Sequence, residues 1–188
     1  MEIEIRAFIQ SIKEFEEKVR KLGGVFDSEK HIIDYWFCEK SASKFEQVKQ
    51  DAPGSYGLRL RIIKGKKDKI ELNCKVLEEH GNHNEFQEYE TEVESFDKMK
   101  QVLENIGFKI FCIVDKTRRA YKLDNSSINI EDIKGFKPAV ELEIIAESRQ
   151  NHKASLKQLL DKLGIKEQDK IEKSITFLYM KENSFKRG

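Results

Sequence analysis

The chain has 188 residues, of which 37% are charged, yet its formal net charge at pH 7 is only +1. The charged fraction is well above the average of about 25% for globular domains. The near balance of acids and bases argues against general nucleic-acid binding, which requires a basic excess. The sequence contains no apolar run as long as a membrane span and no apolar core of a secretion signal. We therefore expect a single cytoplasmic domain over residues 1–188, with no membrane partner.

Charged residues alternate with other residues in at least five stretches, which are residues 2–6, 58–62, 71–75, 88–93 and 141–144. Alternation with period two predicts β-strands that have one charged and one mostly apolar face. The unusual feature is that some stretches carry only carboxylates and others only basic groups. A solvated face mixes the two signs. The separation therefore favours two walls of one cavity, one that binds metal cations and one that binds phosphates.

The same layout occurs three times, as a Glu-x-Glu strand, an amphipathic helix and a glycine. The apolar spacing predicts helices over residues 12–22, 96–106 and 156–163. Ser11 and Glu14 form a capping box before the first helix, and glycine ends each of the three. The alternative explanation is coincidence in a chain rich in glutamate and lysine.

Further strands are predicted over residues 31–37, 70–76, 115–123 and 127–130, and residues 41–57 form the least regular segment. The sum is an α+β fold with about eight mainly antiparallel strands and three principal helices. If the strands close, they form an antiparallel β-barrel with helices packed outside and charged side chains inside. Buried charges need partners. A divalent metal together with a polyphosphate would supply partners for both the glutamates and the arginines.

Cysteine and histidine give little support to another kind of metal site. Cys38, Cys74 and Cys112 are odd in number and widely spaced, which argues against a disulfide framework and fits a reducing compartment. His80 and His83 lie in a polar stretch that contains glycine, so we expect a solvated loop there. A zinc site needs more ligands at usable spacing.

Five charged motifs follow one another along the chain. They are Glu2-x-Glu4-x-Arg6, Leu58-Arg59-Leu60-Arg61 with Lys75 on the following strand, Glu90-x-Glu92, Lys116-x-Arg118-x-x-Tyr121 and Glu141-x-Glu143. In this order they resemble the motifs of the CYTH superfamily, which comprises class IV adenylate cyclases and thiamine triphosphatases and is also called the triphosphate tunnel metalloenzymes. The resemblance covers residues 2–179. Among the departures from the family, Arg6 stands where its signature has lysine, which keeps the charge but changes the contact geometry.

The resemblance implies a charged tunnel that holds a triphosphate and one or two Mg²⁺ or Mn²⁺ ions, for which carboxylate oxygens are suited ligands. Either Glu131 or Asp132 fits a further acidic position of the family. Lys75 is the candidate proton acceptor. The expected metal ligands are Glu2, Glu4, Glu90, Glu92, Glu141 and Glu143. The expected substrate-binding residues are Arg6, Arg59, Arg61, Lys75, Lys116 and Arg118.

The function that this implies is cleavage of a P–O–P linkage, as in a class IV adenylate cyclase that converts ATP to cyclic AMP and pyrophosphate. The first alternative is a triphosphatase that hydrolyses inorganic, thiamine or nucleoside triphosphate. The second is a non-catalytic module that binds polyphosphate or nucleotide. We expect a small molecule carrying a triphosphate as partner, with a homodimer as an open alternative to a monomer.

Overall fold

The structure is a computed structural model that describes residues 2–48, 56–77, 86–145 and 157–185. Of residues 2–4, 56, 77, 86, 144 and 145 it describes the backbone only. The predicted loop with His80 and His83, and Leu156 of the third predicted helix, lie outside the described residues. The chain forms two compact units, which we describe separately. The first unit is Met1–Lys30 with Lys116–Ile175, and the second is His31–Asp115 with Thr176–Gly188.

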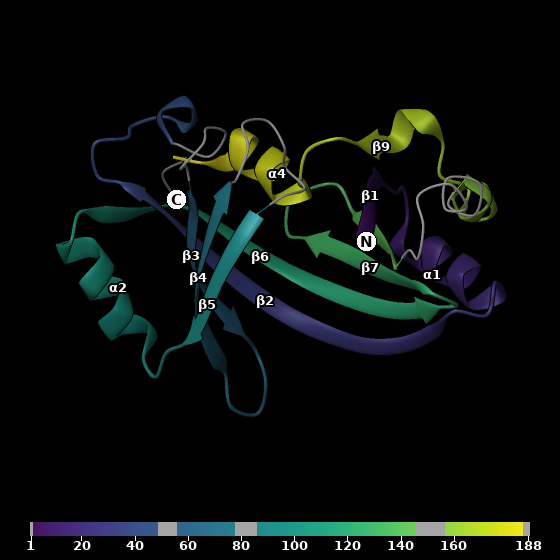
Figure 1. The fold of residues 1–188 in the computed structure, drawn as a ribbon, viewed down its shortest axis with the longest axis horizontal. Helices are drawn as coiled ribbons and strands as arrows, with labels where there is room; N and C mark the ends of the chain where they lie inside the picture. The colour runs from purple at the N-terminus through teal and green to yellow at the C-terminus, as the bar shows by residue number, and fades with distance from the viewer. Residues whose placement is uncertain (1, 49–55, 78–85, 146–156, 186–188) are drawn as a thin grey trace. The chain divides into compact units, whose positions relative to one another are not determined.

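Figure 1 shows the elements in chain order. They are β1 (Glu2–Phe8), α1 (Ile12–Lys21), β2 (Val25–Glu39), the 3-10 turn η1 (Phe45–Gln47), β3 (Tyr56–Ile63), β4 (Lys69–Leu77), β5 (Phe86–Glu92), α2 (Phe96–Asn105), β6 (Phe108–Leu123), β7 (Ser126–Ile133), β8 (Ala139–Ile145), the 3-10 turn η2 (Glu167–Asp169), β9 (Lys170–Ile171) and α4 (Ile175–Asn183). Residues 157–163 are also helical.

The strands form one nine-stranded antiparallel sheet in the order β5-β4-β3-β2-β6-β7-β8-β1-β9. The α+β class and the antiparallel pairing are therefore confirmed, with the two-residue strand β9 as an addition. Among the described residues no hydrogen-bonded ladder joins β5 to β9, so the predicted closed barrel is not confirmed. The long strands β2 and β6 lie next to each other in Figure 1 and contribute residues to both units.

In the first unit, α1 covers the apolar face of the sheet. The Ser11 hydroxyl accepts a hydrogen bond from the Glu14 backbone N–H at 3.3 Å, which caps the helix as the sequence predicts. Gly23 follows the helix with φ +93°, a conformation that favours glycine. Phe15 and Val19 of α1 pack with strand residues such as Leu142 in one core. The remaining buried members of this core are Ala7, Tyr121, Leu123, Ile128, Ile130, Val140, Leu160, Leu163 and Ile165.

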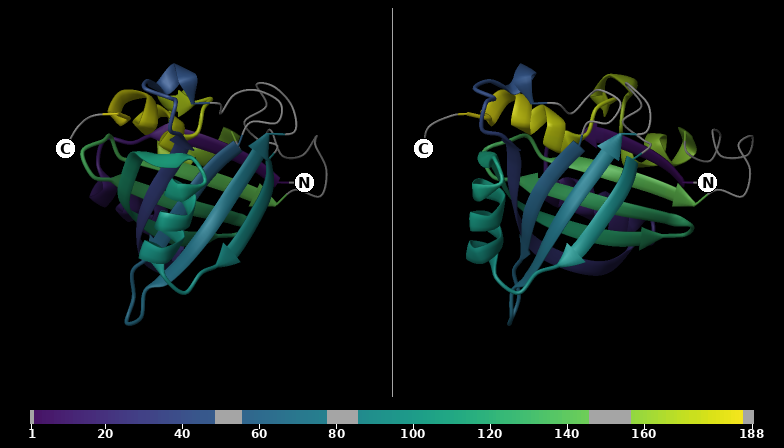
Figure 2. Two further views of the ribbon diagram at one scale, coloured as in Figure 1. Left: turned by 90° about the vertical axis from the view of Figure 1, so that its left-hand side faces the viewer. Right: turned by 60° about the vertical axis from the view of Figure 1, so that its left-hand side comes forward.

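In the second unit, α2 has the corresponding role. Ser95 caps the helix by accepting a hydrogen bond from the Lys98 backbone N–H at 3.3 Å. Leu103 of α2 packs against Leu58, Leu60 and Phe37 of the sheet. Figure 2 shows β3, β4 and β5 side by side. In both units the apolar strand face therefore lies under a helix, as the alternation predicts.

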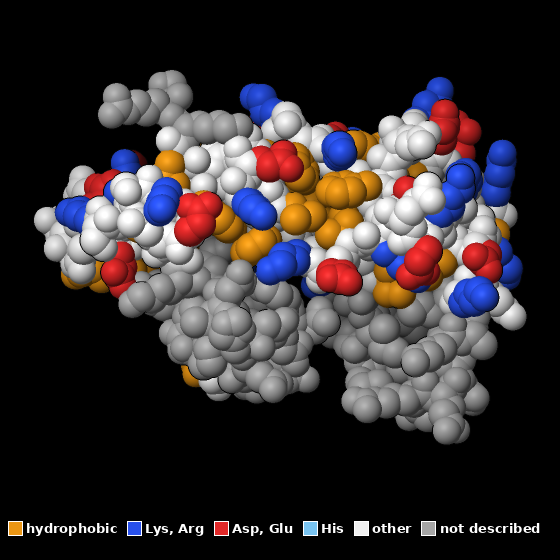
Figure 3. Space-filling model, turned by 90° about the horizontal axis from the view of Figure 1, so that it is seen from above, with side chains coloured by type: hydrophobic (Ala, Val, Ile, Leu, Met, Phe, Trp, Pro, Cys, Tyr) orange, Lys and Arg blue, Asp and Glu red, His pale blue; other side chains and the backbone are white. Residues whose placement is uncertain are grey.

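The charged face of the strands is also partly buried. Asp34 and Glu131 are 0% and 1% exposed, although each has a carboxylate. The other buried polar or charged side chains are Arg6, Arg59, Glu71, Asn73, Lys116 and Asn129. By contrast, basic and acidic side chains are interspersed on the outer face drawn in Figure 3. Some charged side chains of the strands are thus buried in each unit, whereas Glu90 and Glu92 of β5 are exposed.

Three differences from the sequence predictions have local physical reasons. Helix α4 is not predicted, because its residues carry no polar face against which an apolar stripe would stand out. Strand β2 begins at Val25, whereas the sequence predicts a start at residue 31. The prediction missed residues 25–30 because they are mostly exposed and lack regular alternation. Strand β6 begins at Phe108 instead of residue 115, and its apolar start has no period-two pattern. None of the helices in the described part of the chain is long and apolar enough to cross a membrane.

Candidate functional site

Charged side chains of β2, β3, β4 and β5 form the Asp34 cluster of the second unit, which comprises Asp34, Arg59, Arg61, Asn73 and Glu90. The strand register explains why they lie together. Asp34 is opposite Arg61 in the β2–β3 ladder, Arg59 is opposite Asn73 in the β3–β4 ladder, and Asn73 is opposite Glu90 in the β4–β5 ladder. Because directly opposed residues share a face of the sheet, the five side chains lie on one face.

Asp34 is the anchor of this cluster. Arg61 donates two hydrogen bonds to it, from Nε to Oδ1 at 2.7 Å and from Nη2 to Oδ2 at 2.9 Å. Nη1 of Arg59 lies 3.7 Å from Oδ2 of the same carboxylate. The paired fork of Arg61 is the strongest form of such a contact. One buried acid on β2 therefore holds both arginines of the Leu-Arg-Leu-Arg motif on β3.

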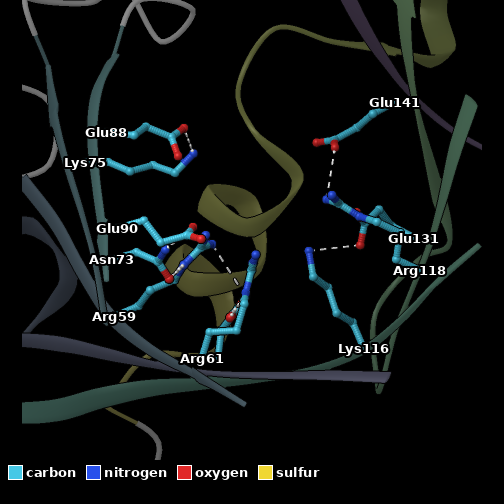
Figure 4. A network of polar contacts seen from close by, with 11 residues as sticks. Arg59, Arg61, Asn73, Lys75, Glu88, Glu90, Lys116, Arg118, Glu131 and Glu141 are labelled. Atoms are coloured by element: carbon cyan, nitrogen blue, oxygen red, sulfur yellow. Dashed lines mark hydrogen bonds and ion pairs between the residues drawn. The ribbon is translucent and has the colours of Figure 1, made fainter. Parts of the chain in front are cut away.

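Arg59 has further partners on the same face. Its Nε donates to Oδ1 of Asn73 at 3.1 Å, and Nδ2 of Asn73 donates to Oε2 of Glu90 (Figure 4). Its guanidinium carbon lies 5.3 Å from the ring centre of Trp36, within the range of a cation–π contact. Arg59 is thus held by an acid, an amide and an aromatic ring.

Two lysines of β4, Lys69 and Lys75, form three more ion pairs. Lys75 on β4 donates from Nζ to Oε1 of Glu88, its register partner on β5. Nζ of Lys69 lies 2.6 Å from the buried Glu71 and 4.0 Å from Glu92. Lys75 and Lys69 of β4 are therefore paired with acids of the neighbouring strand β5, and Lys69 is also paired with Glu71 of its own strand. This differs from the sequence-based picture of one acidic and one basic wall.

The first unit carries the Glu131 cluster, which comprises Arg6, Lys116, Arg118, Glu131 and Glu141. Nζ of Lys116 lies 3.0 Å from Oε2 of Glu131, and the Arg118 guanidinium contacts Oε1 of the same carboxylate (Figure 4). Nη2 of Arg118 also lies 3.4 Å from Oε2 of Glu141, and Nε of Arg6 lies 3.5 Å from its Oε1. Glu131 thus binds the two bases of the Lys-x-Arg motif.

The ionisation of the Glu131 cluster follows from these contacts. Burial would raise the pKa of the Glu131 carboxyl, but the charges of Lys116 and Arg118 and their hydrogen bonds outweigh it, so this pKa is lowered. Burial would lower the pKa of the Arg118 guanidinium, but Glu131 and Glu141 raise it above its ordinary value. Acid and bases therefore stabilise each other in the charged form.

The two clusters share one construction. In each, two bases stand at positions i and i+2 of a strand, Arg59 and Arg61 on β3 or Lys116 and Arg118 on β6. A buried acid on the neighbouring strand is the register partner of the second base, Asp34 for Arg61 and Glu131 for Arg118. Each unit therefore presents two fixed cations on one strand face.

The expected metal ligands are only partly described. Glu141 and Glu143 lie at alternate positions of β8 and so share one face. Glu4 is the register partner of Glu143 in the β1–β8 ladder, while the side chains of Glu2 and Glu4 lie outside the described part of the chain. Two carboxylates of this kind fit a magnesium-like ion, which keeps several water ligands.

Further observations concern the expected metal ligands. Glu143 accepts a hydrogen bond from Nδ2 of Asn129 at 3.2 Å. Glu90 and Glu92 lie on the exposed strand β5 of the second unit. The described side chains include no group of three His, Cys, Asp or Glu residues that could hold a metal.

Sequence reasoning missed Asp34 and Asn73 as members of the site. Asp34 is a single acid in the apolar stretch 31–37, and that isolation is the signal that could have identified it. The sequence also left Glu131 and Asp132 open. In the structure Glu131 belongs to the cluster, while Asp132 is exposed.

The chain is similar to known proteins over most of its length. A family model described as CYTH domain matches residues 1–175. A protein of Methanocaldococcus jannaschii, named as a candidate adenylate cyclase, is 25% identical over 181 residues, which are 93% of this chain and 95% of that protein.

Two solved structures have a similar fold. A conserved protein of Pyrococcus furiosus is 26% identical with a TM-score of 0.71, over 93% of this chain and 98% of that one. A Hippeastrum protein, described as a candidate adenylyl cyclase with a dominant triphosphatase activity, is 16% identical with a TM-score of 0.64, over 97% and 95% of the two chains. At that identity the likeness shows the fold alone.

The Glu131 cluster yields a pH-dependent stability prediction. Replacement Glu131→Gln should lower the free energy of unfolding at neutral pH by about 3 kcal/mol, the usual cost of removing one partner from a buried ion pair. Because the folded-state pKa of Glu131 is lowered, the contribution of its carboxylate is complete above the ordinary value of 4.5. It is lost as the pH falls through the lower folded value. The stability gap between wild type and variant should therefore shrink below about pH 4.5.

Urea unfolding of the wild type and of Glu131→Gln, measured at steps of about half a pH unit between about pH 3 and pH 7, checks this prediction. The control is Glu167→Gln, whose side chain is 88% exposed in its ion pair with Lys170. It should change little at any of these pH values. A gap for Glu131→Gln that stayed constant down to pH 3 would contradict the assignment of the lowered pKa.

Proposed function

The chain belongs to the CYTH domain family, and from this premise we propose that it is a divalent-metal-dependent enzyme that binds a triphosphate and cleaves a P–O–P linkage. The observation that carries the proposal is the pair of prearranged bases on each unit's charged strand face. Arginine forks match phosphate oxygens in a bidentate manner. A buried strand face with such bases suits a compact polyanion better than a solvated surface would.

The roles of the basic residues follow from their contacts. Arg59 and Arg61 would bind phosphate oxygens through their guanidinium groups, which Asp34 and Asn73 orient. In the first unit, Lys116, Arg118 and Arg6 would act in the same way. The carboxylates beside them fix the direction of each base, so little side-chain entropy is lost when a phosphate binds.

Glu141 and Glu143 would hold the cation, with Glu2 and Glu4 as further candidates. Mg²⁺ or Mn²⁺, when bound, would offset the charge that develops at phosphorus. Nη2 of Arg118 donates a hydrogen bond to Oε2 of Glu141 at 3.4 Å, and this contact orients the carboxylate. Glu90 and Glu92 remain candidate ligands on the second unit.

Hydrolysis is the reaction that needs least from the chain, because water is the nucleophile and the charged clusters suffice. The triphosphatase activity that is described for the Hippeastrum protein agrees with this choice. The second candidate is cyclisation of ATP, in which the ribose 3′-hydroxyl is the nucleophile. It is favoured by the name of the Methanocaldococcus relative. A purely binding module is less favoured, because Glu141 and Glu143 stand beside the bases.

Lys75 is the proposed proton acceptor, but its contacts favour a second role. Its Nζ forms an ion pair with Glu88, and its side chain is 28% exposed. A charged ammonium binds phosphate well. We therefore propose that the main role of Lys75 is to bind phosphate. Replacement Lys75→Met tests whether Lys75 also accepts a proton.

The arginines of the second unit can be tested by binding. Replacement Arg59→Ala or Arg61→Ala should weaken the binding of inorganic triphosphate by about 1.5–3 kcal/mol, which is the range for a hydrogen bond to a charged group. Isothermal titration calorimetry measures this loss. Lys64→Ala is the matched control, because Lys64 is an exposed base of the same unit that pairs with Asp68. Unchanged affinity in both arginine variants would refute phosphate binding by this cluster.

The acidic pair can be tested by metal response and by products. Mg²⁺ or Mn²⁺ should raise the melting temperature of the wild type by mass action. This shift, and turnover of every triphosphate, should be lost in Glu141→Gln and Glu143→Gln, because the carboxylate is replaced at nearly constant shape. The control is Glu167→Gln on the exposed surface of the same unit.

Mass spectrometry of the products from ATP, thiamine triphosphate and inorganic triphosphate distinguishes the reactions. Orthophosphate identifies a hydrolase, whereas cyclic AMP with pyrophosphate identifies a cyclase. If both glutamine variants stayed fully active, or kept the metal-induced shift, Glu141 and Glu143 would be a solvated face instead of a metal site.

A further inference from the structure

Asp34 is the most completely buried acid of the second unit that no motif of the sequence assigns. Its side chain is 0% exposed and lies on β2 between two apolar neighbours. Burial of a carboxylate is costly unless charged and hydrogen-bonding groups compensate it. Arg61 supplies two hydrogen bonds at 2.7 and 2.9 Å, and Arg59 adds a third nitrogen at 3.7 Å. The acid therefore belongs to the basic motif of β3 and not to the apolar core.

The direction of these contacts shows what Asp34 does to the arginines. It engages the Nε and one terminal nitrogen of Arg61, which fixes the plane of that guanidinium. Arg59 is fixed from three sides by Asp34, Asn73 and the Trp36 ring. Gly57 leaves room for the Trp36 ring, because a Cβ at this position would lie only 3.0 Å from a carbon atom of the ring.

We propose that Asp34 is a positioning residue whose buried carboxylate holds Arg59 and Arg61 in the geometry that binds phosphate. This inference rests on the proposed function and adds a determinant of affinity to it. Asp34 itself does not touch the substrate. It acts through the two guanidinium groups, and it keeps them extended over the strand face when no anion is bound.

The proposal makes a prediction opposite to that of simple electrostatics. A negative charge close to a phosphate site repels the ligand, so its removal should strengthen binding if charge alone mattered. If Asp34 positions the arginines, its removal should weaken binding, because two prearranged contacts become mobile and must be ordered again by the ligand. The sign of the change therefore separates the two explanations.

The test uses the full chain, inorganic triphosphate as the probe, and EDTA to prevent turnover and metal binding. Calorimetry should show that Asp34→Asn binds triphosphate at least about tenfold more weakly than the wild type, as expected from loss of a charge-assisted contact. Asp68→Asn is the matched control. It removes the same charge from an exposed residue of the same unit that pairs with Lys64. Its affinity should stay within about twofold of the wild type.

The variant Asp34→Glu tests whether the carboxylate itself is what keeps the two arginines able to bind phosphate. It keeps the carboxylate, which can still reach both guanidinium groups, so the affinity should return to within about threefold of the wild type. Chemical denaturation of each variant shows that the protein titrated is folded. If Asp34→Asn does not fold, Asp34→Glu carries the test.

The outcomes are distinct. Equal or tighter binding by folded Asp34→Asn, or a loss of more than about tenfold in folded Asp34→Glu, would overturn the positioning role. Failure of both variants to fold would overturn it too, since the carboxylate would then serve the fold. Absence of triphosphate binding by the wild type, both in EDTA and with Mg²⁺ present, would refute the proposed function itself, and with it this inference.

Discussion

Burial of a charged side chain is tolerable only when an opposite charge accompanies it, and both units of this protein are built around that requirement. In each unit the strands have an apolar face covered by a helix and an opposite face that carries charges. Asp34 and Glu131 are nearly inaccessible to water. Each is paired with two bases of a neighbouring strand, so the positions of all three groups are set by strand register rather than by loops.

This construction has a consequence for function. Buried ion pairs are seldom the most stabilising way to fill an interior, because desolvation offsets much of their attraction. A chain under selection for stability alone has apolar alternatives at positions such as Lys116 and Glu131. Bases that are already desolvated and oriented, however, bind an anion without further ordering. We therefore propose that the pairs serve phosphate recognition more than fold stability.

Local patterns in the sequence were sufficient to predict much of the fold. Period two predicted the strands, and Ser11, Ser95 and the glycines after the helices predicted the bounds of α1 and α2. The sequence did not predict α4, which is apolar without a polar face, or the extension of β2 and β6. It also missed Asp34 as part of the site, because an acid that pairs across strands has no partner nearby in sequence. Register, which decides such pairs, depends on the whole sheet.

Stability and triphosphate affinity can be compared most directly in one variant, Lys116→Met/Glu131→Leu, which replaces a buried ion pair by apolar side chains and leaves Arg118 paired with Glu141. If the pair serves phosphate binding, the free energy of unfolding should stay within about 1.5 kcal/mol of the wild type or rise. The affinity for inorganic triphosphate should fall at least about tenfold, because the proposed phosphate-binding base is gone. A variant that loses stability but binds triphosphate as the wild type does would contradict the proposal that the buried pairs serve phosphate recognition.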